Sequence, residues 1–322
     1  MFGILYDTQD WTWQIPDKKL QRLIECIDEA RIRKALRDKE VQSLAGKLIN
    51  IKPLVPSAKF NLDHVMKLLA ASHRSANVPI DELCDRQLAY WRMMLVACSG
   101  KLAIPDNVSS FPVGAVDAFT DAAGGTLENL GRGTGGVCLQ KWFYYPWSKA
   151  INSGTAKLHD SKISRKLSAL ELVGPLILVS AMAAELTHVA VRIWVDNAGS
   201  VQIWKKGYSN NCDLCSTLVK ALGTVAAAHG TRIDIVKVTR CSGVGPTLAD
   251  HLSKAQFGPF RACALQNGWQ LQTEPLRIPA TLVRWLHHPK PDDELGHDIL
   301  SELAGQHNVL GYNSRTHNQF PC

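Results

Sequence analysis

The stretch VDAFTDAAGG, residues 116–125, brings an aspartate, Asp121, to the end of an apolar run that favours a β-strand. No basic residue stands beside this aspartate in the sequence. Burying an unpaired carboxylate costs at least several kcal/mol, so an acid in such a position is usually paired, neutralised or bound to a cation. The helices and strands expected around this strand help to decide whether Asp121 is paired, neutralised or bound to a cation.

The elements that follow alternate in a way that predicts one mixed sheet. Three strands come in succession, and helices then alternate with two further strands, which is typical of a mixed sheet with helices on its faces. We therefore expect an α/β domain with a five-stranded mixed sheet and flanking helices. The expected strands are 116–122, 134–140, 142–147, 189–195 and 232–239, and the expected helices are 167–186, 198–205, 212–229 and 246–255.

Four acids occupy matching positions in this pattern. Asp121 ends the first strand, and Asp196 ends the apolar strand VAVRIWV. Glu171 lies on an almost wholly apolar helix, and Asp250 lies early in the helix that follows the last strand. Sites tend to form at the C-terminal edge of an α/β sheet. Carboxylates gathered there repel one another unless divalent cations lie between them, and such oxygen ligands suit Mg²⁺ or Mn²⁺.

Each acid also has a simpler structural explanation. Asp196 precedes NAGS and could cap the next helix. Glu171 could pair with Lys166, and Asp250 could pair with Lys254 one helical turn later. Each explanation is plausible singly, but four acids in matching positions of one pattern are much harder to explain in this way.

The residues around the four acids resemble the type 1 ribonuclease H family. AFTDAAGG…GRGTGGVCL resembles its opening hairpin, SALELVG its glutamate helix, RIWVDNAGSVQIWKKG its second-aspartate strand and helix, and LADHLSK its final-aspartate helix. The resemblance implies a ribonuclease H-like fold for residues 116–257. It also implies that Asp121, Glu171, Asp196 and Asp250 bind two Mg²⁺ ions, or Mn²⁺, and hydrolyse the RNA strand of RNA·DNA hybrids.

Residues 1–104 are expected to form a hairpin over 2–15 followed by a mostly helical region. The expected helices begin at Asp17 and then cover 38–52, 62–72 and 80–99. This part resembles the segment after the palm of retroelement reverse transcriptases, where a hairpin leads to the thumb and connection helices. ADHLSKAQF, which begins at residue 249, resembles the ribonuclease H ends of DIRS-like and related retrotransposon polyproteins. The resemblance implies a reverse transcriptase polymerase domain as a partner.

The rest of the chain divides around these two regions. The Pro-, Ser- and Asn-containing stretch at 105–115 is expected to be a linker. Residues 258–322 are expected to form a C-terminal tail of unknown role, with two tryptophans and a last helix near 298–304. We see no internal repeat in the sequence.

Two departures from the family pattern matter for function. The sequence has no Tyr-x-Asp-Asp motif and no palm before residue 1, so we expect a fragment of a longer reading frame that does not itself polymerise. Cellular ribonucleases H also carry a mobile histidine shortly before the last aspartate. Here the loop is RCSGVGPT, and His251 follows Asp250 instead, which bears on turnover more than on the chemistry.

The charge distribution favours a polyanionic partner. Residues 111–262 hold 16 Lys and Arg against 10 Asp and Glu, which is +6 of the net +7 of the chain. Phosphate contacts from such residues give affinity that does not depend on base sequence. We expect contacts to an RNA·DNA hybrid from clusters that also contain Trp204 and Tyr208, although each cluster could equally be a solvated helix face. The expected contacts are Lys162, Arg165, Lys166, Lys205, Lys206 and Arg240.

Other features give weaker predictions. The nine cysteines and the lack of a secretory signal or a long apolar run favour an intracellular protein without a membrane anchor, in the cytoplasm or nucleus. Cys212 and Cys215 form a CxxC pair, but a zinc site needs four ligands and the second pair is missing. The glycines of GRGTGG are expected in a hairpin turn.

The preferred interpretation is thus a metal-dependent ribonuclease H of a retroelement. Two alternatives stay open: a non-catalytic nucleic-acid-binding or scaffold relic that keeps the fold, and a different ribonuclease H-like nuclease or transposase. The presence of all four acids argues against the first alternative, and the thumb-like front argues against the second.

Overall fold

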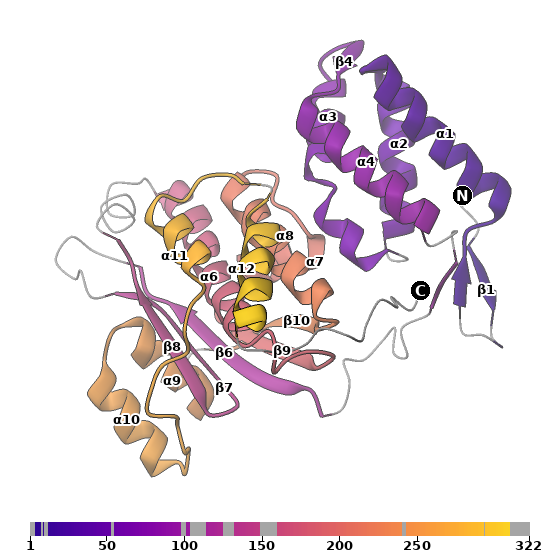
Figure 1. Cartoon of the computed structure of the whole chain (residues 1–322). Helices are drawn as coiled ribbons and strands as arrows, with labels where there is room; N and C mark the ends of the chain where they lie inside the picture. The colour runs from indigo at the N-terminus through magenta and orange to yellow at the C-terminus, as the bar shows by residue number, and fades with distance from the viewer. Residues whose placement is uncertain are drawn as a thin grey trace. The chain divides into compact units, whose positions relative to one another are not determined.

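The structure, a computed structural model, describes residues 4–7, 9, 12–52, 55–97, 101–103, 114–124, 132–148, 160–239, 243–292 and 294–309. The described residues up to 103 belong to one compact unit, and those from 114 onward belong to a second (Figure 1). Of the expected linker, only residues 114 and 115 are among those described.

The first unit contains four helices and two small sheets among its described residues. One sheet has the order β1-β2-β5 with antiparallel pairs, so the hairpin expected near the N-terminus is present and gains a third strand. The other sheet pairs β3 with β4. The elements are β1 (Leu5–Asp7), β2 (Thr12–Gln14), α1 (Asp17–Arg33), β3 (Ala35–Arg37), α2 (Asp38–Ile51), η2 (Pro56–Phe60), α3 (Asp63–Ser72), β4 (Asn77–Pro79), α4 (Glu82–Ala97) and β5 (Lys101–Ala103).

The helices of this unit pack through apolar faces with helical spacing. On α2, Val41, Leu44, Leu48 and Ile51 are all buried, as their spacing predicts. Trp91 on α4 is fully buried, and its indole N–H donates to the Asn61 carbonyl at 2.8 Å. The unit therefore has a core of its own.

The second unit is built on a five-stranded mixed sheet, which confirms the predicted architecture. The strand order is β10-β9-β6-β7-β8. Strands β6, β7 and β8 form an antiparallel meander, whereas β9 and β10 run parallel to β6. The elements are β6 (Val116–Ala122), β7 (Gly133–Cys138), β8 (Lys141–Pro146), α6 (Asp160–Ala181), β9 (Ala190–Val195), α7 (Ala198–Lys206), α8 (Asp213–Ala228), β10 (Arg232–Lys237), α9 (Val244–Ser253), α10 (Phe257–Gln266), α11 (Ala280–His287) and α12 (Leu295–Val309).

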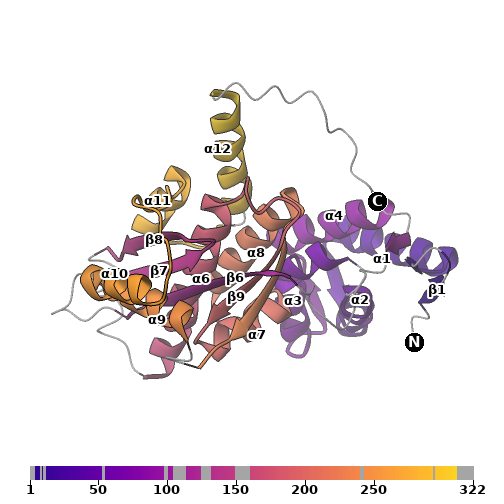
Figure 2. The same ribbon diagram turned by 90° about the horizontal axis from the view of Figure 1, so that it is seen from below.

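Helices cover both faces of this sheet (Figures 1 and 2). A Cβ atom on Gly174 of α6 would lie within 3.0 Å of Thr134, while a Cβ atom on Gly135 would overlap Leu252 of α9. Thr134 and Gly135 are neighbours on β7, and successive strand residues point to opposite faces. Helix α6 therefore packs on one face, together with α8, and α9 packs on the other face, together with α10.

The glycine-rich stretch was expected to form a hairpin turn, and this expectation is wrong. Gly133–Gly136 are buried residues of β7. The turn between β7 and β8 uses Leu139 and Gln140, which both have positive φ. The glycines are needed inside the strand because atoms of β8, α9 and β6 lie where their Cβ atoms would be.

The segment after residue 257 packs against the sheet unit. On α10, Phe260 and Ala264 join an apolar cluster with Trp142 of β8 and Leu248 of α9. Helix α12 packs on α8, where Gly296 lies against Ala221 and Thr224. The boundary expected at residue 257 does not coincide with a break in packing, and α10 and α11 were not foreseen.

Among the residues that the structure describes, no helix combines the length and the apolar character needed to cross a lipid bilayer.

Candidate metal site at the sheet edge

Three of the four predicted acids come together at one edge of the sheet. Asp121 lies on β6, Glu171 on α6, and Asp196 directly after β9. One carboxylate oxygen from each of the three lies within 4.8 Å of the others. The parallel pairing of β6 with β9 brings the ends of these two strands together, and the close packing of α6 on β6 brings Glu171 to them.

Asp121 is held in place by groups from two other elements. Ser253, the last residue of α9, has its Oγ 2.5 Å from Oδ2 of Asp121. The same Oγ lies 2.9 Å from the Asp250 carbonyl. Because a hydroxyl has a single hydrogen and a carboxylate is the stronger acceptor, we assign the donated bond to Asp121. Thr134 of β7 donates to the backbone carbonyl of Asp121 at 3.0 Å.

Glu171 is the buried member of the cluster, with 4% of its surface exposed. Burial raises its pKa well above the ordinary value, and the negative charges of Asp121 and Asp196 raise it further. The Ala122 N–H opposes these effects by hydrogen bonding to the carboxylate. Oε2 of Glu171 is buried and has no hydrogen-bond partner within the described part of the chain.

Asp196 does not act as the cap of the next helix. The cap of α7 is Asn197, whose Oδ1 accepts from the Ser200 N–H at 3.1 Å. The Ser168 hydroxyl of α6 also donates to this oxygen at 3.2 Å. The explanation of Asp196 as a simple helix cap is therefore wrong, and its carboxylate is one of the three in the cluster.

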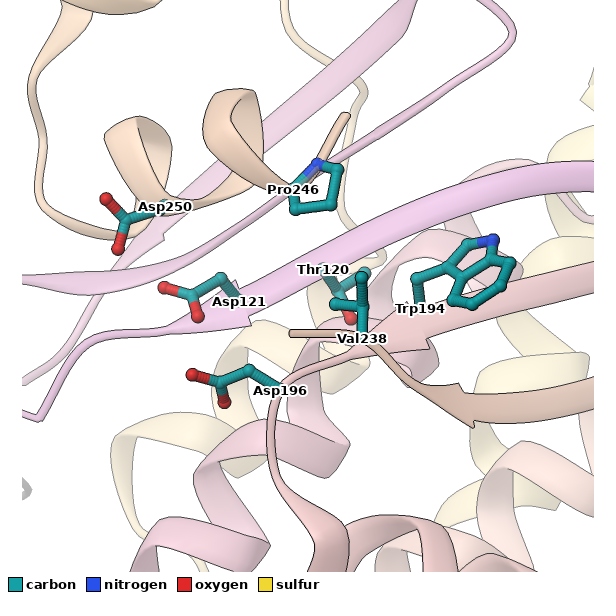
Figure 3. A pocket seen from close by; sticks show the side chains of 7 residues that line it. All are labelled: Thr120, Asp121, Trp194, Asp196, Val238, Pro246 and Asp250. Carbon is teal, nitrogen blue, oxygen red and sulfur yellow. The ribbon is translucent and has the colours of Figure 1, made fainter. Parts of the chain in front are cut away.

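Asp250 lies beside the cluster rather than within it. It lines the same small pocket as Asp121 and Asp196, and the three carboxylates extend toward the same side of the sheet edge (Figure 3). Its carboxylate is also ion-paired with Lys254 at 2.7 Å, one helical turn later. The ion pair considered for Asp250 from the sequence is thus present, and the described geometry groups only the other three acids at ligand distance.

The three carboxylates fit a divalent cation. They offer only oxygen donors, they are close enough to share one ion, and a buried oxygen of Glu171 lacks any other partner among the described residues. Hard oxygen ligands of this kind suit Mg²⁺ or Mn²⁺. A cation at this place would also relieve the repulsion among the three negative charges.

Sequence reasoning missed several residues that shape the site. Trp194 lines the pocket, stacks on Phe119 with ring centroids 6.5 Å apart, and donates its indole N–H to Asp117 at 2.8 Å. It precedes Asp196 by two residues, so the period of a strand places both on one face. That alternation was readable from the sequence. The roles of Ser253 and Asn197 depend on tertiary contacts that local pattern does not reveal.

The predicted nucleic-acid contacts are only partly described. The side chains of Lys162, Arg165 and Lys166 on α6, and all of Arg240, lie outside the described residues. Lys205 is exposed at the end of α7, and Lys206 is partly exposed.

The aromatic residues of the same cluster are core residues. Trp204 and Tyr208 are 5% and 6% exposed, so they do not offer open rings to bases. Lys206 Nζ lies 4.5 Å from the centroid of the Tyr208 ring, which shows that this lysine packs over a side chain of its own unit.

The CxxC pair does not belong to any metal-ligand group in the described part of the chain. Cys212 caps α8, and its sulfur accepts a hydrogen bond from the Cys215 N–H at 3.4 Å. Among the described residues, the acid cluster is the one group of three or more metal-ligand side chains at suitable distances.

Comparison of this chain with models of known protein families, with curated proteins and with solved structures finds no match.

Proposed function

We propose that residues 116–257 form a ribonuclease H-like domain that hydrolyses the RNA strand of RNA·DNA hybrids with Mg²⁺ or Mn²⁺. The observation that supports this most is the cluster of Asp121, Glu171 and Asp196, in which a buried carboxylate lies against two others. The five-stranded mixed sheet is consistent with such a fold. The order of the acids along the chain agrees with the family pattern.

In this proposal, the protein residues hold and orient the ions. Asp121, Glu171 and Asp196 would supply carboxylate oxygens from strand β6, helix α6 and the residue that follows β9, which are rigid supports. Ser253 fixes the direction of the Asp121 carboxylate. When bound, a pair of divalent ions supplies activation of the attacking water and stabilisation of the leaving oxygen. Asp250 would join as a fourth ligand only after giving up its ion pair with Lys254.

The retroelement assignment is the second part of the proposal. The sequence resemblance of residues 1–104 to the thumb and connection regions supports a role beside a reverse transcriptase polymerase domain. In the proposed complex, the exposed Lys205 at the end of α7 would contact phosphates of the hybrid. The intracellular location expected for such an element is part of the same proposal.

Incubation of the full chain with a labelled RNA·DNA hybrid, in Mg²⁺, in Mn²⁺ and in EDTA, tests the proposal. We expect cleavage of the RNA strand with either metal and none in EDTA. Single-stranded RNA and double-stranded DNA of the same sequence are the substrate controls. Asp234→Asn is the protein control, because Asp234 is a partly exposed aspartate on β10 outside the cluster.

One observation favours the scaffold alternative enough to include it in the test. Asp250 is ion-paired with Lys254, as expected of a residue with a purely structural role. A protein that binds the hybrid but cleaves it with neither metal would support a scaffold. Cleavage of double-stranded DNA instead would point to another nuclease or a transposase of this fold.

A further inference from the structure

The start of α8 brings the sulfur of Cys212 against the backbone of Cys215. Cys212 is the N-cap residue with an extended backbone, φ −150° and ψ 98°, and Cys215 lies in the first turn. The Cys215 N–H donates to the Cys212 sulfur at 3.4 Å, so this sulfur lies over the first turn of the helix. Neither cysteine is in a disulfide.

The two thiols differ in access to solvent. Cys212 is partly exposed, whereas Cys215 has no exposed surface. A partly exposed sulfur that receives hydrogen bonds, next to a buried sulfur three residues later, is the arrangement in which the first thiol attacks and the second resolves. This pair lies on a different element from each of the three clustered acids.

We propose that Cys212 and Cys215 form a redox-active dithiol, in which Cys212 attacks a hydroperoxide and Cys215 then closes a disulfide. This inference does not depend on the nuclease proposal. It assigns a modification site to the CxxC pair, for which the described residues offer no additional metal ligand.

The chemistry balances in two steps. The Cys212 thiolate attacks one peroxide oxygen, the O–O bond breaks, and the leaving alkoxide takes a proton to become an alcohol, or water for hydrogen peroxide. Cys212 is then a sulfenic acid. The Cys215 sulfur attacks the Cys212 sulfur, the S–S bond forms, and the displaced hydroxide leaves as water with the Cys215 proton. The two thiols lose two electrons, and the peroxide gains them.

The other described thiols provide a contrast within the same molecule. The hydrogen bond from Cys215 lowers the pKa of Cys212 to about 7, and backbone N–H groups of the first turn contribute to the shift, despite partial burial. Burial raises the pKa of both Cys84 and Cys138 to about 12. Of these three thiols, only Cys212 is a thiolate to any large extent near neutral pH.

Hydrogen bonds to the Cys212 sulfur stabilise its thiolate, so a larger fraction of this thiol is ionised near neutral pH than of an unperturbed thiol. Thiolate nucleophilicity falls as pKa falls, which offsets part of this gain. We expect Cys212 to react with iodoacetamide at pH 7 faster than Cys84 and Cys138 do.

The decisive experiment treats the folded full chain with hydrogen peroxide and then maps its cysteines by alkylation and mass spectrometry. We expect a Cys212–Cys215 disulfide that dithiothreitol reverses. In the Cys215→Ser variant, oxidation should stop at the sulfenic acid of Cys212, which dimedone traps. Cys212→Ser should give neither product, and it should keep the fold because serine is a good N-cap. Cys263→Ser is the matched control and should behave as the wild type, because Cys263 is a partly buried cysteine on another helix.

The proposal is overturned if stoichiometric peroxide leaves both thiols of the folded wild type free. It is also overturned if Cys215→Ser yields no dimedone adduct at Cys212 while circular dichroism shows an intact fold. Tight stoichiometric Zn²⁺ binding, lost in both single variants, would assign the pair to a metal site instead and would likewise overturn the redox proposal.

Discussion

Each of the two units buries an acid, and the two acids have opposite surroundings. Asp63 in the helical unit is 6% exposed, and Glu171 in the sheet unit is 4% exposed. The Gln87 amide donates to Oδ1 of Asp63, and Nε2 of His64 lies 3.5 Å from Oδ2. Glu171 instead lies against two other carboxylates, and its Oε2 has no partner among the described residues.

This difference distinguishes an acid that stabilises the fold, which we call a structural acid, from an acid that belongs to a candidate binding site. The network around Asp63 is closed further by Gln87, whose Oε1 accepts from the His64 N–H at 3.0 Å. Hydrogen bonds from such neighbours offset the free-energy cost of burying the carboxylate. A buried carboxylate that faces like charges raises the free energy of the metal-free fold, so it is retained only if a cation or a function compensates.

The largest expected effect is on chemistry, at Asp196. Asp196→Asn keeps the size of the side chain but removes a charge that would hold the cation. Since bound ions supply both the nucleophile and leaving-group stabilisation in the proposed reaction, hybrid cleavage should fall on the order of a thousandfold or more. The measurement is the single-turnover cleavage rate in Mg²⁺.

The fold should survive this change, because removing one negative charge relieves repulsion in the cluster. Hybrid binding in EDTA should persist or become tighter. Unfolding of Asp196→Asn would instead show that the aspartate is structural, although Asn197 already caps the helix.

The second effect is on stability, through metal binding. A cation that binds only the folded state adds about 2.7 kcal/mol at a concentration of about 100 times its Kd. Titration with Mg²⁺ or Mn²⁺ should therefore raise hydrogen-exchange protection of β6, α6 and β9. Amides of α3, which carries Asp63, are the internal control and should not respond. Equal protection of α3 and β6 would contradict a site at the cluster.

The sequence predicts much of the sheet unit because its signals are local. Strand β6 was foreseen with its observed bounds, since the apolar run and the small residues after it mark both ends. The alternation of helices and strands also predicted the mixed sheet. Asp121, Glu171 and Asp196 could be found because a strand end or an apolar helix face is an unusual place for an acid.

The features that the sequence does not predict depend on tertiary contacts. No local signal distinguishes Asp196 from Asn197 as the cap of α7, since both are good N-cap residues. The glycines of β7 resemble a turn until the packing of α9 against Gly135 is known. The ion pair between Asp250 and Lys254 follows from helical spacing, but which partner Asp250 prefers depends on the site around it.

The third effect tests the structural acid. Asp63→Leu is close in volume but leaves the buried Gln87 amide without its carboxylate acceptor. An unsatisfied buried donor costs about 1–3 kcal/mol, so the helical unit should lose that much stability. Hydrogen exchange of α3 and α4 amides measures this loss. No change would show that the network around Asp63 adds nothing to the fold.

The smallest expected effect is a gain in the free energy of unfolding, and it comes from a substitution at Glu171. Glu171→Gln keeps an acceptor for the Ala122 N–H and removes the buried charge. In EDTA near neutral pH, the variant should be more stable than the wild type, by less than the loss at Asp63. The gain should depend on pH, because the folded state holds the Glu171 proton more tightly than the unfolded chain, where the pKa is near 4.5.

The sign follows from that difference in proton affinity. Below the unfolded pKa, Glu171 is protonated in both states and wild type and variant should be similar. As the pH rises through the window between the unfolded pKa and the raised folded pKa, the wild type loses stability relative to Glu171→Gln. Urea unfolding in EDTA across this pH range measures the difference, and Mg²⁺ should reverse it. A variant less stable than the wild type at neutral pH in EDTA would mean that Glu171, like Asp63, is a satisfied structural acid.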